Sequence, residues 1–266
     1  MEFLNLLLIV FVLFFPTALA TDDRIPGSVF IQDKETAVLQ SAPFWFFGRS
    51  LNREPCYPED AAPNGKQNPG TSVPLTLSPG AGCPSPGNWN GTYSLGNPFP
   101  TYWAMTYCPD DASWRINYNL YFSHDGMGGI GHKHDWEWVA AIWKSCDEGN
   151  DLWCRVRLIR SFHRTPKSED WGSIQNTINS KDEIRHLGDK NKHHPLIYVG
   201  AFKHAMFDTR KTTVNIIGAD DDEFRSNDWW YFAGDFLVDG SVIDRAWDYG
   251  AASSTPLHVM DEICSK

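Results

Sequence analysis

The stretch Arg115-Ile116-Asn117-Tyr118-Asn119-Leu120-Tyr121-Phe122 places a large apolar side chain at every second position. Ile116, Tyr118, Leu120 and Phe122 therefore fall on one face of an extended chain, because successive β residues point to opposite faces. A period of two over eight residues predicts a strand with one face in the core.

Similar runs follow. Trp136–Trp143 is apolar on both faces apart from Glu137, which is typical of a central strand in a sandwich. Leu152–Leu158 alternates so that Arg155 and Arg157 are expected to point outward. Shorter runs at Leu196–Phe202, Thr213–Ile217 and Trp229–Phe232 complete the set. With one or two short helices expected within 168–192 and a long loop region at 50–100, the sequence predicts a mostly-β, two-sheet β-sandwich.

The first twenty residues have the layout of a secretory signal. The nearly unbroken apolar run Leu6–Phe15 precedes small residues at Ala18 and Ala20, and the polar start at Thr21 favours cleavage. We expect a signal peptide at 1–20 and a single domain at 21–266. The mature protein is predicted to be extracellular.

The net charge of −10 restricts the partners. Nucleic-acid binding needs a basic surface, and simple adsorption to anionic lipid needs one too. We therefore expect no nucleic-acid partner, and any membrane contact to be peripheral and specific.

Six cysteines in an exported chain predict three disulfides, for which fifteen pairings are possible. Cys146 and Cys154 are favoured as one pair because they flank a short turn between two strand-like runs. The sequon at Asn90, in a loop rich in Gly, Pro and Asn, predicts a glycosylation site.

The segment from Asp125 to Glu137 carries the chemistry. Asp135 and Glu137 lie two residues apart at the start of a strand and are predicted to share a face. Two carboxylates leading into an apolar strand repel each other unless a cation lies between them. Asp125 precedes a glycine-rich loop that can fold it back onto the same ion, and His132 can bind the ion or hold a bound water.

Oxygen ligands favour Ca²⁺ or Mg²⁺. Two alternatives remain open at this point. The spacing of His132 and His134 also permits zinc, with both imidazoles on the strand face opposite the carboxylates. The charged groups can instead form a hydrogen-bonded ion-pair cluster with Lys133 or a distant arginine, without metal.

The heptapeptide Gly131-His132-Lys133-His134-Asp135-Trp136-Glu137 resembles the Gly-His-Arg-His-Asp-Trp-Glu signature of the necrosis- and ethylene-inducing-protein-like (NLP) family, with Lys133 in place of Arg. Further segments are similar to family segments along nearly the whole mature chain. These are Cys56–Pro58, Tyr121–Asp125, His194–Val199, Lys203–Phe207 and Trp247–Pro256.

The resemblance implies a sandwich like that of actinoporins and fungal fruit-body lectins. It implies a secreted cytolysin of a plant-associated microbe, monomeric in solution, that binds glycosylinositol phosphorylceramide head groups on plant plasma membranes with the help of a metal. Carried over by position, the metal-shell residues are Asp125, His132, Asp135 and Glu137.

The same resemblance implies that His134, Phe202 and His204 contact the head group, and that Cys56 pairs with Cys83. Cys108 and Cys264 then remain for the third disulfide. We expect a binding protein and no enzyme. The alternatives are a calcium-dependent glycan-binding protein that does not perforate membranes, a secreted metallohydrolase with Glu137 or His134 as general base, and a structural or decoy protein with an inactive site.

Overall fold

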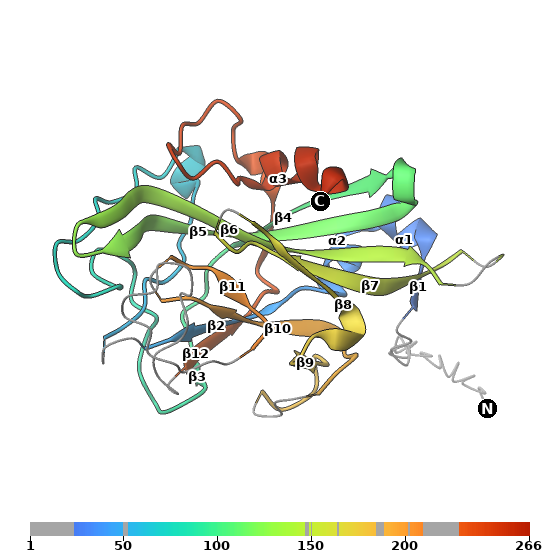
Figure 1. Ribbon diagram of the computed structural model, residues 1–266, viewed down its shortest axis with the longest axis horizontal. Coiled ribbons are helices and arrows are strands. Elements are labelled where there is room, and N and C mark those ends of the chain that lie inside the picture. Colours follow the sequence, from blue (N-terminus) through green and yellow to red (C-terminus); the bar gives the residue numbers. More distant parts are fainter. Residues whose placement is uncertain are drawn as a thin grey trace, which may run out of the picture.

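The computed structural model describes residues 24–49, 53–146, 149, 151–163, 165–184, 189–201, 203–209 and 229–266. Two mixed β-sheets face each other across one core (Figure 1). The predicted signal peptide, the strand expected at 213–217 and Phe202 lie outside the described residues.

The larger sheet contains, among the described residues, seven strands with β6 and β5 at its centre, in the order β1-β7-β6-β5-β4-β13, and β8 pairs with β7. The strands are β1 (Arg24–Pro26), β4 (Thr101–Cys108), β5 (Ser113–Met127), β6 (Ile130–Ser145), β7 (Leu152–Arg160), β8 (Lys167–Asp170) and β13 (Leu237–Asp239).

The smaller sheet has the order β11-β10-β2-β12-β3, and β9 pairs with β10. Its described strands are β2 (Phe44–Gly48), β3 (Ser94–Leu95), β9 (Thr177–Ile178), β10 (His194–Val199), β11 (Met206–Phe207) and β12 (Trp229–Ala233). β10 and β2 run parallel at its centre.

The alternation in β5 is confirmed. Its four apolar residues, from Ile116 to Phe122, lie in the core between the sheets together with Trp45 and Ile197 of the smaller sheet. Each such side chain, once fully buried, contributes about 1.5–3 kcal/mol to folding. The fold prediction of a two-sheet sandwich is therefore confirmed at the level of the residues that form the core.

β5 and β6 form a long hairpin that runs from the pair Ser113 and Lys144 to the pair Met127 and Ile130. Its length is about 45 Å at the rise of a β-strand. In Figure 1 the hairpin is green, with its tip far from α1 (Gly27–Gln32). The core occupies the middle of the hairpin, and the charged heptapeptide lies toward its tip.

The outer face of the larger sheet is also covered. Trp138, Ala140 and Ile142 pack against Val259 and Ile263, from α3 (Pro256–Glu262) and the turn after it. A further helix, α2 (Lys34–Leu39), follows α1. Of the short helices expected within 168–192, the described residues contain one, a 3₁₀ helix at Trp171–Ser173 between β8 and β9.

Arg155 was expected outside and is buried, because a β-bulge changes the register of β7. Ile142 pairs with Arg157 and Trp143 with Arg155, so Val156 is the extra residue. The Arg155 guanidinium lies over the Trp143 ring, 4.9 Å from its centroid, and donates a hydrogen bond to the Gln40 carbonyl at 2.9 Å.

The three expected disulfides are present: Cys56–Cys83, Cys108–Cys264 and Cys146–Cys154. Cys108–Cys264 ties the end of β4 to the C-terminus. Cys56–Cys83 fastens the long loop region, whose described part contains one 3₁₀ turn at Pro63–Gly65 before β3. Asn90 lies exposed in this region, and its glycosylation stays a prediction. None of the helices in the described residues is both long and apolar enough to cross a membrane.

His194 gives the fold an acid-sensitive point. Its Nδ1 donates to the Ala42 carbonyl at 2.8 Å, and its Nε2 accepts from the Ser180 hydroxyl at 2.7 Å. Burial lowers the pKa of His194 to about 4. Below about pH 6.5 the His194 imidazole takes up a proton in the unfolded chain but not in the folded protein. The contribution of His194 to the free energy of unfolding is therefore complete above about pH 6.5 and is lost toward pH 4.

We expect His194→Gln, which keeps both hydrogen bonds in kind, to flatten the fall of stability between pH 6.5 and 4 by about 2–3 kcal/mol. Urea unfolding of wild type and variant across this range measures the difference. His258→Gln, at a half-exposed position on α3, is the control and is expected to keep the fall of stability that His194→Gln flattens. Parallel profiles for wild type and His194→Gln would contradict a neutral buried His194.

Candidate metal centre

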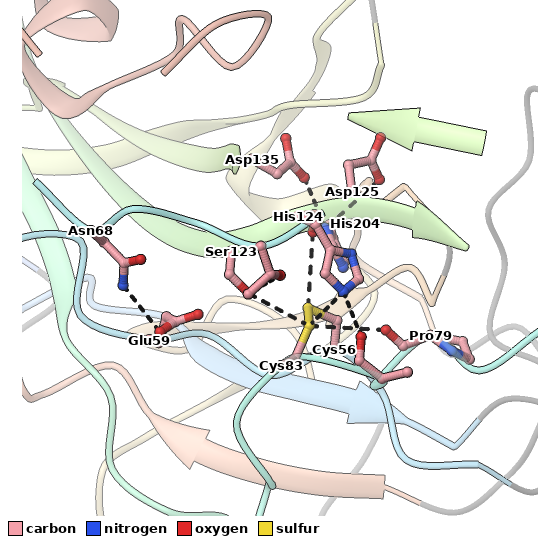
Figure 2. The surroundings of a disulfide bond; sticks show 12 residues. Cys56, Glu59, Asn68, Pro79, Cys83, Ser123, His124, Asp125, Asp135 and His204 are labelled. Atoms are coloured by element: carbon pink, nitrogen blue, oxygen red, sulfur yellow. Dashed lines mark hydrogen bonds and ion pairs between the residues drawn. A yellow bond between two sulfur atoms is a disulfide. The ribbon is translucent and has the colours of Figure 1, made fainter. Parts of the chain in front are cut away.

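Three potential ligands converge near the tip of the β5–β6 hairpin. One ligand atom each from Asp125, Asp135 and His204 lies within 4.8 Å of the other two. All three residues are buried, with 9%, 6% and 2% of their surfaces exposed. Figure 2 shows the two carboxylates and the imidazole pointing toward one another. We refer to these three residues as the acidic cluster.

The backbone of the hairpin departs from a regular ladder at the acidic cluster. Asp135 pairs with Phe122, and Asp125 pairs with His132, so strict alternation places the two carboxylates on opposite faces. Between these pairs His134 adopts a left-handed conformation, with φ of 61°. Such a φ is strained for a residue with a side chain. The interruption coincides with the point where Asp125 turns to the Asp135 side.

His204 is supplied by the segment before β11. Its Nδ1 donates to Asp135 Oδ2 at 2.8 Å and lies 3.9 Å from Asp125 Oδ1. The ring stacks on Phe122, with centroids 3.9 Å apart and planes 8° from parallel. His204 also has a positive φ, of 50°. The hydrogen bond and the stacked ring fix the imidazole between the two sheets.

Burial dominates the electrostatics of the cluster. It raises the pKa of Asp135 well above the usual range of a carboxyl, although the neighbouring His132 lowers it in part. A second carboxylate nearby adds repulsion. The charged forms of Asp125 and Asp135 are therefore stable together only with added positive charge. A divalent cation supplies that charge, and carboxylate oxygens are the ligands that Ca²⁺ and Mg²⁺ prefer. The donor set fits a divalent metal, and both the binding of a metal and its identity stay predictions.

Two predicted metal ligands lie beside the cluster. His132 is at its rim, with 38% of its side chain exposed, and its Nε2 is 3.5 Å from Asp125 Oδ2. Glu137 shares the inward face with Asp135, as predicted, and its carboxylate accepts a hydrogen bond from the Ser161 hydroxyl. Their roles as ligands stay predictions. His204, expected to contact the head group, lies in the cluster itself.

His134 points away from the cluster. Its Nδ1 is 2.7 Å from the Tyr121 hydroxyl, and its ring packs edge-on against Tyr249. His132 and His134 therefore have different neighbours, which disfavours the zinc arrangement in which both imidazoles bind one ion. A head-group contact for His134 or for Phe202, which is outside the described residues, stays a prediction.

The disulfide Cys56–Cys83 packs against His124, the residue next to Asp125. His124 precedes Asp125, and its Nε2 lies 3.2 Å from Cys83 Sγ and 3.0 Å from the Ala81 carbonyl (Figure 2). Burial lowers the pKa of His124, which favours its neutral form. Because both sulfurs are in a disulfide, this second group of potential ligands has no thiolate to offer a metal.

The ion-pair alternative can be weighed on the same contacts. His204 Nδ1 lies near both Asp125 and Asp135, His132 Nε2 lies 3.5 Å from Asp125 Oδ2, and Lys133 is exposed on the strand. Two imidazoles, of His204 and His132, therefore lie within reach of the carboxylates, and the ion-pair alternative stays open beside a metal.

Comparisons with known proteins give structural matches alone. No protein-family model and no curated protein matches the chain. Fourteen chains of known structure do match. The structures named here are of NLP proteins. Non-toxic HaNLP3 is 20% identical, with 86% of this chain and 89% of that chain covered and a TM-score of 0.49.

Two further matches are more distant. Necrosis and Ethylene inducing Protein 2 from the causal agent of cocoa's Witches Broom disease is 16% identical, with 81% and 75% of the two chains covered and a TM-score of 0.43. NLPPya in complex with glucosamine is 15% identical, with 86% and 90% covered and a TM-score of 0.45.

A metal at the acidic cluster has a measurable effect on stability. We expect calcium or magnesium to raise the melting temperature of the wild type. At an ion concentration a hundred times Kd, the free energy of unfolding increases by about 2.7 kcal/mol. Asp135→Asn abolishes this rise. Without the ion at pH 8, the variant is at least as stable as the wild type, because it removes a buried charge.

Differential scanning fluorimetry with each ion and with chelator measures both effects. Asp170→Asn on β8, an exposed carboxylate, is the matched control and keeps the ion response. A variant that is less stable without ion, in a protein that shows no ion response, would instead indicate an ion-pair cluster.

Proposed function

We propose that this protein is a secreted, metal-dependent cytolysin that binds glycosylinositol phosphorylceramide head groups of plant plasma membranes and damages the membrane. The observation that supports the proposal most is the acidic cluster at one end of the sandwich. It includes Asp135 of the heptapeptide, and it unites Asp125, Asp135 and His204 from segments that are distant in the sequence.

Each residue has a part in this proposal. Asp125 and Asp135 hold a calcium or magnesium ion, and His204 orients Asp135 through the bond to its Oδ2. The bound ion supplies positive charge to which sugar hydroxyls and phosphate oxygens bind. His132, at the rim, is placed to bind the same head group. Exposed Lys133 adds a cation for its phosphate.

The proposed activity is binding followed by membrane damage, without catalysis of a bond change. Secretion follows from the signal-like start at 1–20 and agrees with three disulfides, which persist in oxidising compartments. We propose a monomer in solution that makes a peripheral contact with the membrane.

Dye release from vesicles containing plant glycosylinositol phosphorylceramide tests the proposal. We expect release by the wild type with calcium or magnesium and none with chelator. Asp135→Ala reduces release at least tenfold, because the ion has lost a ligand, while Asp170→Ala does not. Vesicles of phosphatidylcholine alone are the lipid control.

The outcomes separate the candidate functions. Ion-dependent binding without release would replace the cytolysin with a glycan-binding protein that does not perforate membranes. If the wild type neither binds nor releases, the proposed function is wrong.

A further inference from the structure

Three apolar side chains at the tip of the β5–β6 hairpin are exposed to solvent. Leu75 is 87% exposed, Ile130 70% and Leu77 68%. Of the large apolar residues that are exposed in the described chain, two elsewhere have similar exposure, Ile31 at 69% and Leu95 at 64%. Single exposed apolar residues are ordinary, but a cluster of them marks an interaction site. We call Leu75, Leu77 and Ile130 the apolar tip.

The loop and the hairpin hold these side chains together. Gly128 and Gly129 at the turn donate backbone hydrogen bonds to the carbonyls of Thr76 and Pro74, at 3.1 and 2.9 Å. The leucines lie over the two glycines. A methyl group at Gly128 would be 3.2 Å from Leu77 Cδ2, and one at Gly129 would be 3.3 Å from Leu75 Cδ2. The glycines thus give the leucines room beside Ile130.

The apolar tip is a presented surface and not a frayed loop. Thr71 N donates to the Ser123 carbonyl at 2.9 Å on one side of the loop apex, and the Cys56–Cys83 disulfide holds the other. The loop is therefore anchored on both sides while its leucines point to solvent. A loop whose backbone is already anchored loses little further backbone entropy on binding.

The tip lies next to the acidic cluster. Ile130 pairs with Met127, and two steps along the same ladder Asp125 pairs with His132. Two residues of a strand span about 7 Å. A flat surface that contacts the tip therefore also comes close to the rim at His132.

The charge around the tip differs from that of the whole protein. No Asp, Glu, Lys, Arg or His occurs from Gln67 to Pro109, and between Gly126 and His134 the charged residue is Lys133. In a chain of net charge −10, the two segments that form this end carry no carboxylate. Phosphate-bearing head groups meet no acidic side chain of these segments here, and Lys133 attracts them.

We infer that the apolar tip enters the boundary between head groups and acyl chains of a phospholipid or sphingolipid bilayer, while the acidic cluster holds a head group beside it. This inference rests on the proposed function and assigns the residues that contact the bilayer interior. Side chains of this kind enter the interface of peripheral membrane proteins, and their apolar area adds to the strength of binding.

Substitution of the tip provides the test. We expect Leu75→Ser/Leu77→Ser/Ile130→Ser to weaken binding to phosphatidylcholine vesicles containing plant glycosylinositol phosphorylceramide at least about tenfold, in co-sedimentation with calcium. Dye release falls in parallel. The calcium-induced rise in melting temperature of the triple variant equals that of the wild type, which shows that its fold and its acidic cluster are intact.

Ile31→Ser is the matched control. Ile31 has nearly the same exposure as Ile130 but lies on α1, which packs near the other end of the hairpin (Figure 1). It is expected to bind vesicles as the wild type does. The single variant Ile130→Ser is compared with it. Equal losses of vesicle binding in the two single variants would mean that general surface hydrophobicity, and not the tip, drives binding.

The remaining outcomes distinguish this inference from the proposed function. Binding that requires Asp135 but is unchanged in the triple variant overturns the apolar tip alone. Binding that the triple variant loses and Asp135→Ala retains supports the tip and overturns the metal-dependent function. If the wild type binds no vesicle, with or without sphingolipid, both are wrong, and the exposed surface then fits a protein partner.

Discussion

The pairing of β5 with β6 runs from Ser113 opposite Lys144 to Met127 opposite Ile130, and the other features of the molecule depend on this register. A shift of one residue would turn Leu120 and Phe122 out of the core. It would also separate Asp135 from Phe122, the residue on which His204 stacks. The apolar residues in the middle of the hairpin therefore set the position of the charged residues near its tip.

This register places buried charged residues, which oppose folding, near the tip of the stable β5–β6 hairpin. Burial of Asp125 and Asp135 opposes folding when both are charged, and His134 and His204 add strained backbone conformations. Strain of this kind persists where the surrounding structure determines it. Here the hairpin, the Cys56–Cys83 disulfide and the smaller sheet do so. Such a site would gain stability from a bound cation, because the cation would offset the repulsion between the two carboxylates.

The strand pattern and the heptapeptide could be recognised from the sequence because each is local. The alternation from Ile116 to Phe122 needs no knowledge of the partner strand, and Asp135 and Glu137 share a face through spacing alone. Arg155 was misplaced because a bulge depends on the pairing of β6 and β7 and leaves no sequence signal in either strand. The helices α1, α2 and α3 have six or seven residues, too few for a helical period, although Asp33 and Pro256 are start signals. His204 carries a motif but no spacing that relates it to Asp125, so its place in the cluster required the tertiary structure.

The acidic cluster and the apolar tip are both small, and neither stands out in the amino-acid composition. A strongly apolar surface would bind membranes without selection and reduce solubility, and a single shallow head-group contact would be weak. Two modest contacts on one rigid end act together, because the first holds the second at high effective concentration. In the proposed function, a head group at the acidic cluster would bring the tip to the bilayer, and the tip would then slow dissociation. On this proposal, the cluster would supply selectivity and the tip residence time, so that an acidic protein could discriminate among membranes without a general affinity for lipid.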